Sequence, residues 1–143
     1  MSLINNNLIL LNYFAETKDD VLRALTNLAH SASRLHNKEL FLEELYRREA
    51  EAPTNIGYSI AIPHGKTDSV KEATLMFIRL NKEIQWNDDR VHLIFGIAVP
   101  ASAPSKVHLT ILANIARKLI HEEMRISLDA ITTPEELIAL LDQ

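Results

Sequence analysis

The segment that decides the fold reads PTNIGYSIAIPHGK and runs from Pro53 to Lys66. Apolar residues alternate with small or polar ones near its centre, a pattern typical of a strand that buries one face. We therefore predict a short strand from Tyr58 to Ile62, with the side chains of Ile60 and Ile62 on the same face.

The residues after this predicted strand carry the chemistry. Pro63 is expected to end the strand, because proline has no amide hydrogen to donate to a sheet. His64 then lies at the strand exit, and Gly65 lets the backbone turn sharply or approach a neighbour closely. The pattern predicts an imidazole held in place at the end of a buried strand, which suits a nucleophile.

Three further strands are predicted around this segment. The run from Val91 to Val99 is almost entirely apolar, as expected for a central strand buried on both faces, and such a strand needs helices on both sides of its sheet. Ala73 to Leu80 is a second strand candidate, and Leu8 to Leu11 is a candidate edge strand. The piece between the two longer strands closes with the turn-forming residues Asn87-Asp88-Asp89.

Four helices are predicted from capping residues and from apolar residues at helical spacing. Their starts are marked by Thr17 with Asp20, by Asn37, by Ser102-Ala103-Pro104 and by Thr133-Pro134-Glu135-Glu136. Strands interleaved with helices indicate an α/β fold, and 143 residues suit one domain, from 1 to 143.

Composition excludes several classes of function. The net charge of −4 gives no basic surface for nucleic acid, and the absence of cysteine excludes disulfides and cysteine-based metal sites. No secretory signal and no apolar run long enough to cross a membrane is apparent, so we expect a soluble, cytoplasmic protein without membrane insertion. No glycine-rich cradle ending in Lys-Ser or Lys-Thr is present, which argues against a nucleotide substrate.

Six histidines are the main candidates for chemistry. Three are expected at or near helix ends, and His92 is expected to be a hydrogen-bonded histidine of the central strand. None forms the paired spacing of a zinc protease, because His121-Glu122-Glu123 lacks a second histidine four residues on. We therefore expect neither a metal site nor a cofactor.

The motif around His64 resembles a known family. Ile60-Ala61-Ile62-Pro63-His64-Gly65, preceded by Arg48-Glu49, Thr54 and Gly57, is similar to the enzyme IIA domains of the bacterial sugar phosphotransferase system, fructose–mannitol type. The resemblance implies a mixed β-sheet flanked by α-helices on both faces. It also implies that His64 accepts a phosphoryl group from the phosphocarrier protein HPr and passes it to a cysteine of the cognate enzyme IIB. This chain, lacking cysteine, cannot be that second partner.

The same resemblance assigns two more residues to the site. His108 matches a second family histidine, and Arg48 matches the family's active-site arginine. Each has a simpler interpretation from the residues alone: Arg48 as a cation favourably placed at a helix C-terminus, and His108 as a histidine with a local bond at a helix start. Thr54 is a further candidate, because its hydroxyl is a possible donor to a phosphoryl oxygen.

The chemistry of imidazole fits a phosphoryl carrier. Neutral imidazole is a competent nucleophile, and its ordinary pKa of about 6.5 keeps it mostly neutral at physiological pH. A hydrogen bond from one ring N–H to a carbonyl would fix the tautomer and leave the other nitrogen free; the resemblance suggests that Nε2 is the reactive one.

Three functions remain open at the level of sequence. The first is a phosphohistidine relay with a shallow apolar docking patch around His64. The second is a regulatory module of the same fold whose phosphorylation state other proteins sense. The third is a non-catalytic binding domain in which His64 is structural. The transported sugar and the oligomeric state are not indicated by the sequence.

Overall fold

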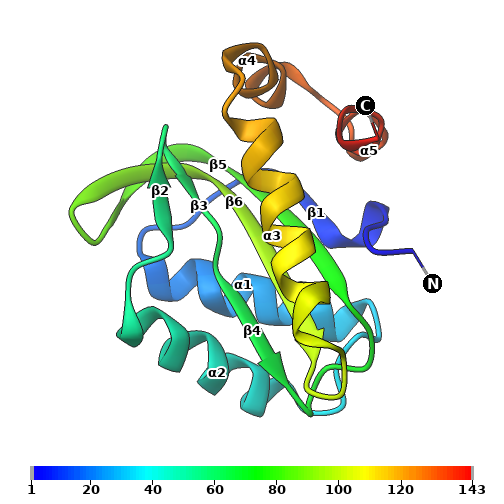
Figure 1. Cartoon of the computed structure of the whole chain (residues 1–143). Helices are drawn as coiled ribbons and strands as arrows, with labels where there is room; N and C mark the ends of the chain where they lie inside the picture. Colours follow the sequence, from blue (N-terminus) through cyan, green and yellow to red (C-terminus); the bar gives the residue numbers. More distant parts are fainter. Residues whose placement is uncertain (1, 143) are drawn as a thin grey trace.

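A computed structural model describes residues 2–142, which build a six-stranded mixed sheet covered by helices on both faces (Figure 1). The strand order is β1-β5-β6-β3-β2, and β4 pairs with β6 beyond β3. The bounds of the strands are β1 Ile9–Tyr13, β2 Asn55–Gly57, β3 Ile60–Ala61, β4 His64–Thr67, β5 Thr74–Trp86 and β6 Asp89–Pro100.

The sheet is mixed because its strands run in both directions. β5 and β6 form an antiparallel hairpin, and β2 is antiparallel to β3. β1 runs parallel to β5, and both β3 and β4 run parallel to β6. The predicted α/β class and mixed sheet are therefore confirmed.

Each face of the sheet has its own hydrophobic core. Along β6, Ile94 and Ala98 pack on the side of α1 Lys18–Ser31 and α2 Lys38–Glu51. The alternate residues Phe95 and Ile97 pack on the side of α3 Ser105–Leu119, α4 Glu122–Ala130 and α5 Pro134–Leu141. A short 3-10 helix, η1 Asn6–Leu8, precedes β1. The apolar run of the central strand thus faces helices on both sides, as predicted.

Most predicted helix starts are confirmed by the capping bonds. The Thr17 side chain accepts from the amide of Asp20 in a full capping box, and Asn37 accepts from the amide of Leu40. The Thr133 side chain caps α5 in the same way, with Pro134 as its first residue. Pro104 precedes α3 but provides no side-chain cap.

The prediction for the central segment was wrong in two respects. Tyr58 and Ser59 do not belong to a strand but form a turn with positive φ angles of 58° and 65°. His64 is not beyond the last strand of the segment but is the first residue of β4. The physical reason is β6, whose length lets it pair with β3 and, after Pro63, with β4.

Two other features differ from the sequence prediction. β5 continues to Trp86 and β6 begins at Asp89, so most of the segment expected to connect two shorter strands belongs to the strands themselves. The turn between them contains Asn87, whose φ is positive at 57°. α4 was not predicted: His121 precedes this separate helix, in which Leu128 alone is buried. No helix among residues 2–142 is long and apolar enough to cross a membrane.

Candidate active site

His64 is positioned by the sheet and by α2. It pairs with Ile97 of β6 in parallel register, and the carbonyl of Pro63 accepts a hydrogen bond from the amide of Ile97 at 3.0 Å. Next to it, a Cβ added to Gly65 would lie 3.0 Å from Cγ of Glu44 and 3.4 Å from Phe41, both on α2. The missing side chain therefore lets β4 lie close against α2, which carries Arg48.

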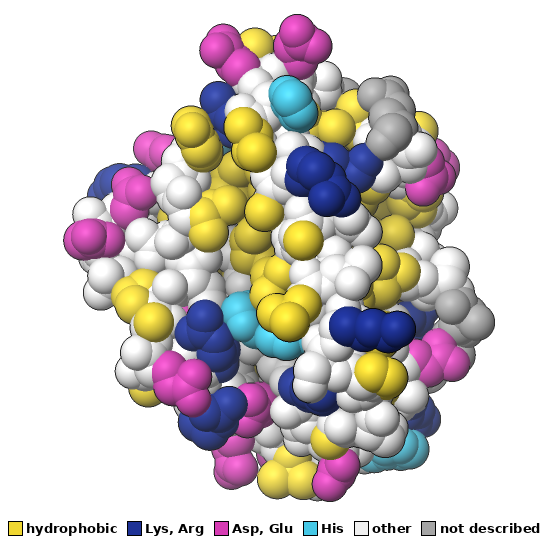
Figure 2. Space-filling model, in the orientation of Figure 1, with side chains coloured by type: hydrophobic (Ala, Val, Ile, Leu, Met, Phe, Trp, Pro, Cys, Tyr) yellow, Lys and Arg dark blue, Asp and Glu magenta, His cyan; other side chains and the backbone are white. Residues whose placement is uncertain are grey.

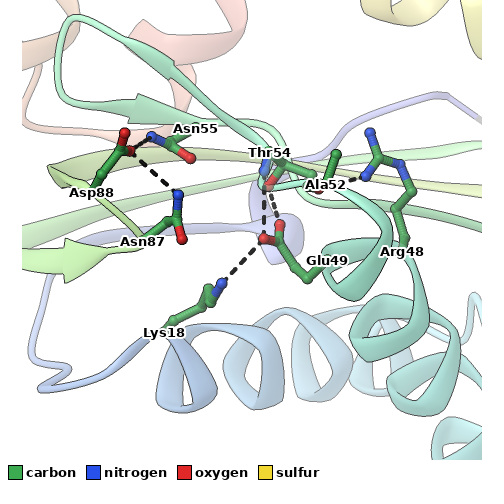
Figure 3. Close-up of polar contacts among 8 residues, drawn as sticks. All are labelled: Lys18, Arg48, Glu49, Ala52, Thr54, Asn55, Asn87 and Asp88. Atoms are coloured by element: carbon green, nitrogen blue, oxygen red, sulfur yellow. Dashed lines mark hydrogen bonds and ion pairs between the residues drawn. The ribbon is translucent and has the colours of Figure 1, made fainter.

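Both ring nitrogens of His64 are hydrogen-bonded. Nδ1 lies 2.9 Å from the carbonyl oxygen of Ile62, which can only accept, so Nδ1 carries the proton. Arg48 Nε donates to Nε2 at 3.1 Å, so Nε2 presents its lone pair. Arg48 Nη1 also donates to the carbonyl of Ala52 at 2.7 Å (Figure 3). His64 is therefore a neutral imidazole of one tautomer, and it is only 9% exposed.

His108 lies beside His64. It belongs to the first turn of α3, and the centroids of the two rings are 4.8 Å apart with the rings tilted by 47°. Its Nε2 is shielded from solvent and has no hydrogen-bond partner among residues 2–142. A buried ring nitrogen without a partner next to the candidate nucleophile is placed to bond a group attached there.

The surroundings favour the neutral form of both imidazoles. Burial lowers the pKa of His64, and the charge of Arg48 adds to this effect; the bond to Ile62 and the charges of Glu49 and Glu44 oppose it. Burial also lowers the pKa of His108, and the neighbouring His64, Lys66 and Arg48 disfavour a positive charge on its ring. Both rings are therefore neutral at physiological pH.

Thr54 is placed differently from the other three predicted site residues. Its hydroxyl donates to a carboxylate oxygen of Glu49, its amide donates to the other oxygen at 3.4 Å, and Lys18 Nζ lies 3.2 Å from that second oxygen (Figure 3). The structure thus brings together His64, Arg48 and His108, while the Thr54 hydroxyl is directed at Glu49. Sequence reasoning assigned no role to Glu49, although it follows Arg48 directly in the motif.

Of the other histidines, His92 is hydrogen-bonded at both ring nitrogens, as expected. Its Nδ1 lies 2.6 Å from the Ser59 hydroxyl and its Nε2 lies 2.6 Å from Asp129. Residues 2–142 contain no group of three or more His, Cys, Asp or Glu residues that would hold a metal ion.

The surface around the histidines is apolar with a basic border. Figure 2 shows histidine side chains in a shallow depression, with hydrophobic side chains extending from it along α3 and Lys or Arg side chains on either side. Leu109, next to His108, is 61% exposed, and Tyr58 in the turn before β3 is equally exposed. Arg125 of α4 lies over the Tyr58 ring, 3.8 Å from its centroid, so a cation–π contact joins the β2–β3 turn to α4.

Comparisons with known proteins show the family to which this chain belongs. The family model described as "Phosphoenolpyruvate-dependent sugar phosphotransferase system, EIIA 2" matches residues 2–143. The fructose-specific EIIA component of Haloferax volcanii is 40% identical over 112 residues, which cover 76% of this chain and 72% of that protein. The 2-O-alpha-mannosyl-D-glycerate-specific EIIABC component of Escherichia coli is 32% identical over 145 residues, and the match spans 99% of this chain but 22% of that protein.

Solved structures show the same fold. The nitrogen regulatory protein IIA-Ntr of Neisseria meningitidis is 30% identical, with a TM-score of 0.89 over 97% of this chain and 96% of that one. The mannitol IIA of Escherichia coli, at 24% identity and a TM-score of 0.81, covers 96% of this chain and 97% of that chain and supports the fold alone. This chain therefore belongs to the EIIA 2 family of the phosphoenolpyruvate-dependent sugar phosphotransferase system, and it is a phosphotransferase that relays phosphoryl groups in that system.

Proposed function

We propose that His64 Nε2 accepts a phosphoryl group from the phosphohistidine of HPr and passes it to a cysteine of a fructose- or mannitol-type enzyme IIB in the cytoplasm. The observation that carries this proposal is the bond from His64 Nδ1 to the Ile62 carbonyl at 2.9 Å. It fixes the proton on Nδ1 and leaves Nε2 as the nucleophile.

Each of the two transfers forms one bond to phosphorus and breaks another. In the first, the Nε2 lone pair forms a P–N bond while the bond from phosphorus to the donor imidazole breaks. The donor ring, protonated at its other nitrogen, leaves with the electron pair as a neutral imidazole, and the His64 ring, protonated at Nδ1, takes over its positive charge. In the second, a cysteine thiolate of enzyme IIB forms a P–S bond, and the electron pair of the P–N bond returns to Nε2. Neither step requires a metal or a nucleotide of this chain, because each transfers an already activated phosphoryl group.

Arg48 and His108 supply the positive charge and the donors that this transfer needs. Before phosphorylation, Arg48 Nε donates a hydrogen bond to the lone pair on Nε2 of His64. The guanidinium therefore has to give up this bond as phosphorus approaches His64. The Arg48 guanidinium can then donate to the equatorial oxygens of the phosphoryl group. Its planar, paired donors suit these oxygens better than the single charge of a lysine would. The free Nε2 of His108 is the second donor, when its ring carries the proton there.

The exposed apolar surface beside the two histidines is the proposed docking face. Two protein partners must bind there in turn and leave, which suits a shallow patch more than a deep cleft. The mannitol IIA of Escherichia coli, which shares this fold at 24% identity, has been solved in complex with phosphorylated enzyme IIB of mannitol. That precedent supports docking of a IIB partner on this fold.

The test is phosphorylation followed by discharge. Incubation with phosphorylated HPr is expected to add one phosphoryl group by intact mass, which mild acid removes, and His64→Ala is expected to gain none. Rapid mixing with a cysteine-bearing enzyme IIB is expected to remove the phosphoryl group from this chain. A IIB variant without the cysteine is the matched control and should leave the phosphoryl group in place. A label of equal size in His64→Ala would overturn the assignment of His64.

A regulatory module is the second candidate function. The similarity to the nitrogen regulatory protein IIA-Ntr of Neisseria meningitidis, at 30% identity over nearly the full length of both chains, favours it specifically. In that case His64 would still be phosphorylated, and its phosphorylation state would be sensed by other proteins. The same discharge experiment separates the two: a label that persists in the presence of every fructose- and mannitol-type IIB tested supports the regulatory function.

A further inference from the structure

Two charged residues near the site occupy helix ends that disfavour their charges. Lys18 is the first residue of α1, and Glu49 lies in the last turn of α2. Helix N-termini favour anions and C-termini favour cations, so each placement is unfavourable by itself. The two charges instead pair with each other, with Lys18 Nζ 3.2 Å from Glu49 Oε2. Stabilisation of the helices therefore does not explain them.

The Glu49 carboxylate is buried and fully engaged. Its side chain is only 6% exposed, and it accepts bonds from the amide and the hydroxyl of Thr54 as well as from Lys18 (Figure 3). A buried carboxylate is tolerated only with such partners. Because Thr54 donates through both its backbone and its side chain, Glu49 fixes the start of the segment that leads into β2.

Thr54 is connected in turn to the His64 ring. Its carbonyl accepts from the amide of Ile62 at 3.0 Å, and the carbonyl of Ile62 accepts from His64 Nδ1 at 2.9 Å. An uninterrupted series of bonds therefore runs from Lys18 through Glu49, Thr54 and Ile62 to the side of the imidazole opposite Arg48.

We propose that Glu49 is a positioning residue that, through Thr54, holds the Ile62 carbonyl in place and thereby keeps the proton of His64 on Nδ1. Lys18 is the counterion that allows the carboxylate to be buried. Thr54 then acts behind the imidazole and does not touch the phosphoryl group. This inference rests on the proposed function, since the tautomer matters because Nε2 is the nucleophile.

Thr54→Val tests the proposal, because valine keeps the shape of threonine but lacks the hydroxyl. Nitrogen-15 NMR of the unphosphorylated protein reports the tautomer, and single-turnover transfer from phosphorylated HPr reports the rate. We expect the two ring nitrogen signals of His64 to move toward a tautomeric average and the rate to fall about tenfold or more, since small misplacements of a nucleophile have effects of that order. Thr54→Ser, which keeps the hydroxyl, should restore both.

The matched control is Thr26→Val. Thr26 is also a buried threonine, 3% exposed, but its hydroxyl donates to the Leu22 carbonyl within α1. This variant should lose stability without changing the tautomer or the rate. If Thr54→Val fails to fold, Glu49→Gln carries the same test, because glutamine keeps the size but loses the charge that pairs with Lys18.

Two results would overturn the proposal: an unchanged His64 tautomer and rate in Thr54→Val or in its substitute Glu49→Gln, or equal changes in Thr26→Val. Failure of the proposed function is recognised separately. In that case the wild-type chain accepts no phosphoryl group. The nitrogen-15 signals of the His64 ring, compared between wild type and Thr54→Val without phosphorylation, still test whether Glu49 acts through Thr54 on the tautomer.

Discussion

At the scale of single residues, the proposed reactivity of His64 follows from what is bonded to each ring nitrogen. Ile62 holds the proton on Nδ1, and Arg48 contacts the lone pair on Nε2. The motif in the sequence pointed to both residues, His64 as the proposed nucleophile and Arg48 as its proposed partner. It did not predict the role of Glu49, because a glutamate in the last turn of a helix is usually a solvent-exposed charge. The contacts with Lys18 and Thr54 that bury its carboxylate exist only in the folded structure.

The first prediction concerns the pH dependence of phosphoryl acceptance. Because burial lowers the pKa of His64, the ring stays neutral when the pH falls through 6.5, the ordinary value of histidine. The acceptance rate should therefore keep its plateau at pH 6.5 and fall only at lower pH. Single-turnover rates between about pH 5 and pH 8 check this. A midpoint at or above the ordinary histidine value of about 6.5 would contradict it.

The second prediction is the linked effect on stability. Below the ordinary histidine pKa the unfolded chain binds a proton at residue 64 before the folded protein does, because the folded pKa is lowered. The free energy of unfolding should therefore fall as the pH decreases from about 6.5 toward the folded pKa, and this slope should be smaller in His64→Ala. Urea unfolding of both proteins across that range is the measurement. Identical slopes would show that His64 is not the titrating group.

The third prediction is that Arg48→Lys slows transfer while leaving the fold intact. Arginine donates through Nε to His64 and through Nη1 to Ala52, and lysine has no planar fork that would place separate donors at these two acceptors. We expect a rate decrease of about tenfold or more. Arg47→Lys is the control, because Arg47 on the same turn pairs with Glu44 and Glu51 of its own helix and not with His64. Equal rates in wild type and Arg48→Lys would reduce Arg48 to a helix-end charge.

At the scale of elements, the site exists because three elements meet at one edge of β6. β4 carries His64, α2 carries Arg48 and α3 carries His108. Sequence predicted α2 from its Asn37 cap and apolar spacing, and α3 from its apolar spacing after Ser102-Ala103-Pro104. It did not predict β4, because pairing with β6 across Pro63 is a long-range interaction without a local pattern. α4 was missed because only one of its residues is buried, which leaves little periodicity to detect.

The fourth prediction belongs to the start of α3. His108→Ala should reduce the transfer rate by about a hundredfold, the usual cost of losing a positioned donor to charge that develops in the transition state. His108→Gln should recover part of this rate, because a neutral amide also donates. Rapid-quench transfer rates of both variants are the measurement. An unchanged rate in His108→Ala would leave His108 as a residue that merely adjoins the site.

At the scale of the whole molecule, one sheet with a core on each face holds these elements in register. The apolar run from Val91 to Val99 predicted this arrangement, since each alternate residue needed a helix to cover it. Gly96 in the same strand shows how tightly the layers pack: a Cβ there would lie 2.7 Å from Leu25, which is fully buried on α1. That contact was not visible in the sequence, because it joins residues far apart in the chain.

The fifth prediction follows from this close approach. Gly96→Ala should lower the free energy of unfolding by about 1–3 kcal/mol, the usual cost of overpacking a core. Gly65→Ala should cost less, because the nearest atom to its new Cβ belongs to the flexible side chain of Glu44. Urea unfolding of the two variants gives the comparison. A larger loss for Gly65→Ala would contradict the packing described for β6 and α1.

The most direct test of the central claim is NMR of the protein after phosphorylation by phosphorylated HPr, with nitrogen-15 in the histidine rings. We expect phosphorus coupling to Nε2 of His64, with the proton retained on Nδ1 and bonded to the carbonyl of Ile62. Coupling to Nδ1, or phosphorus on another residue with the His64 signals unchanged, would contradict it.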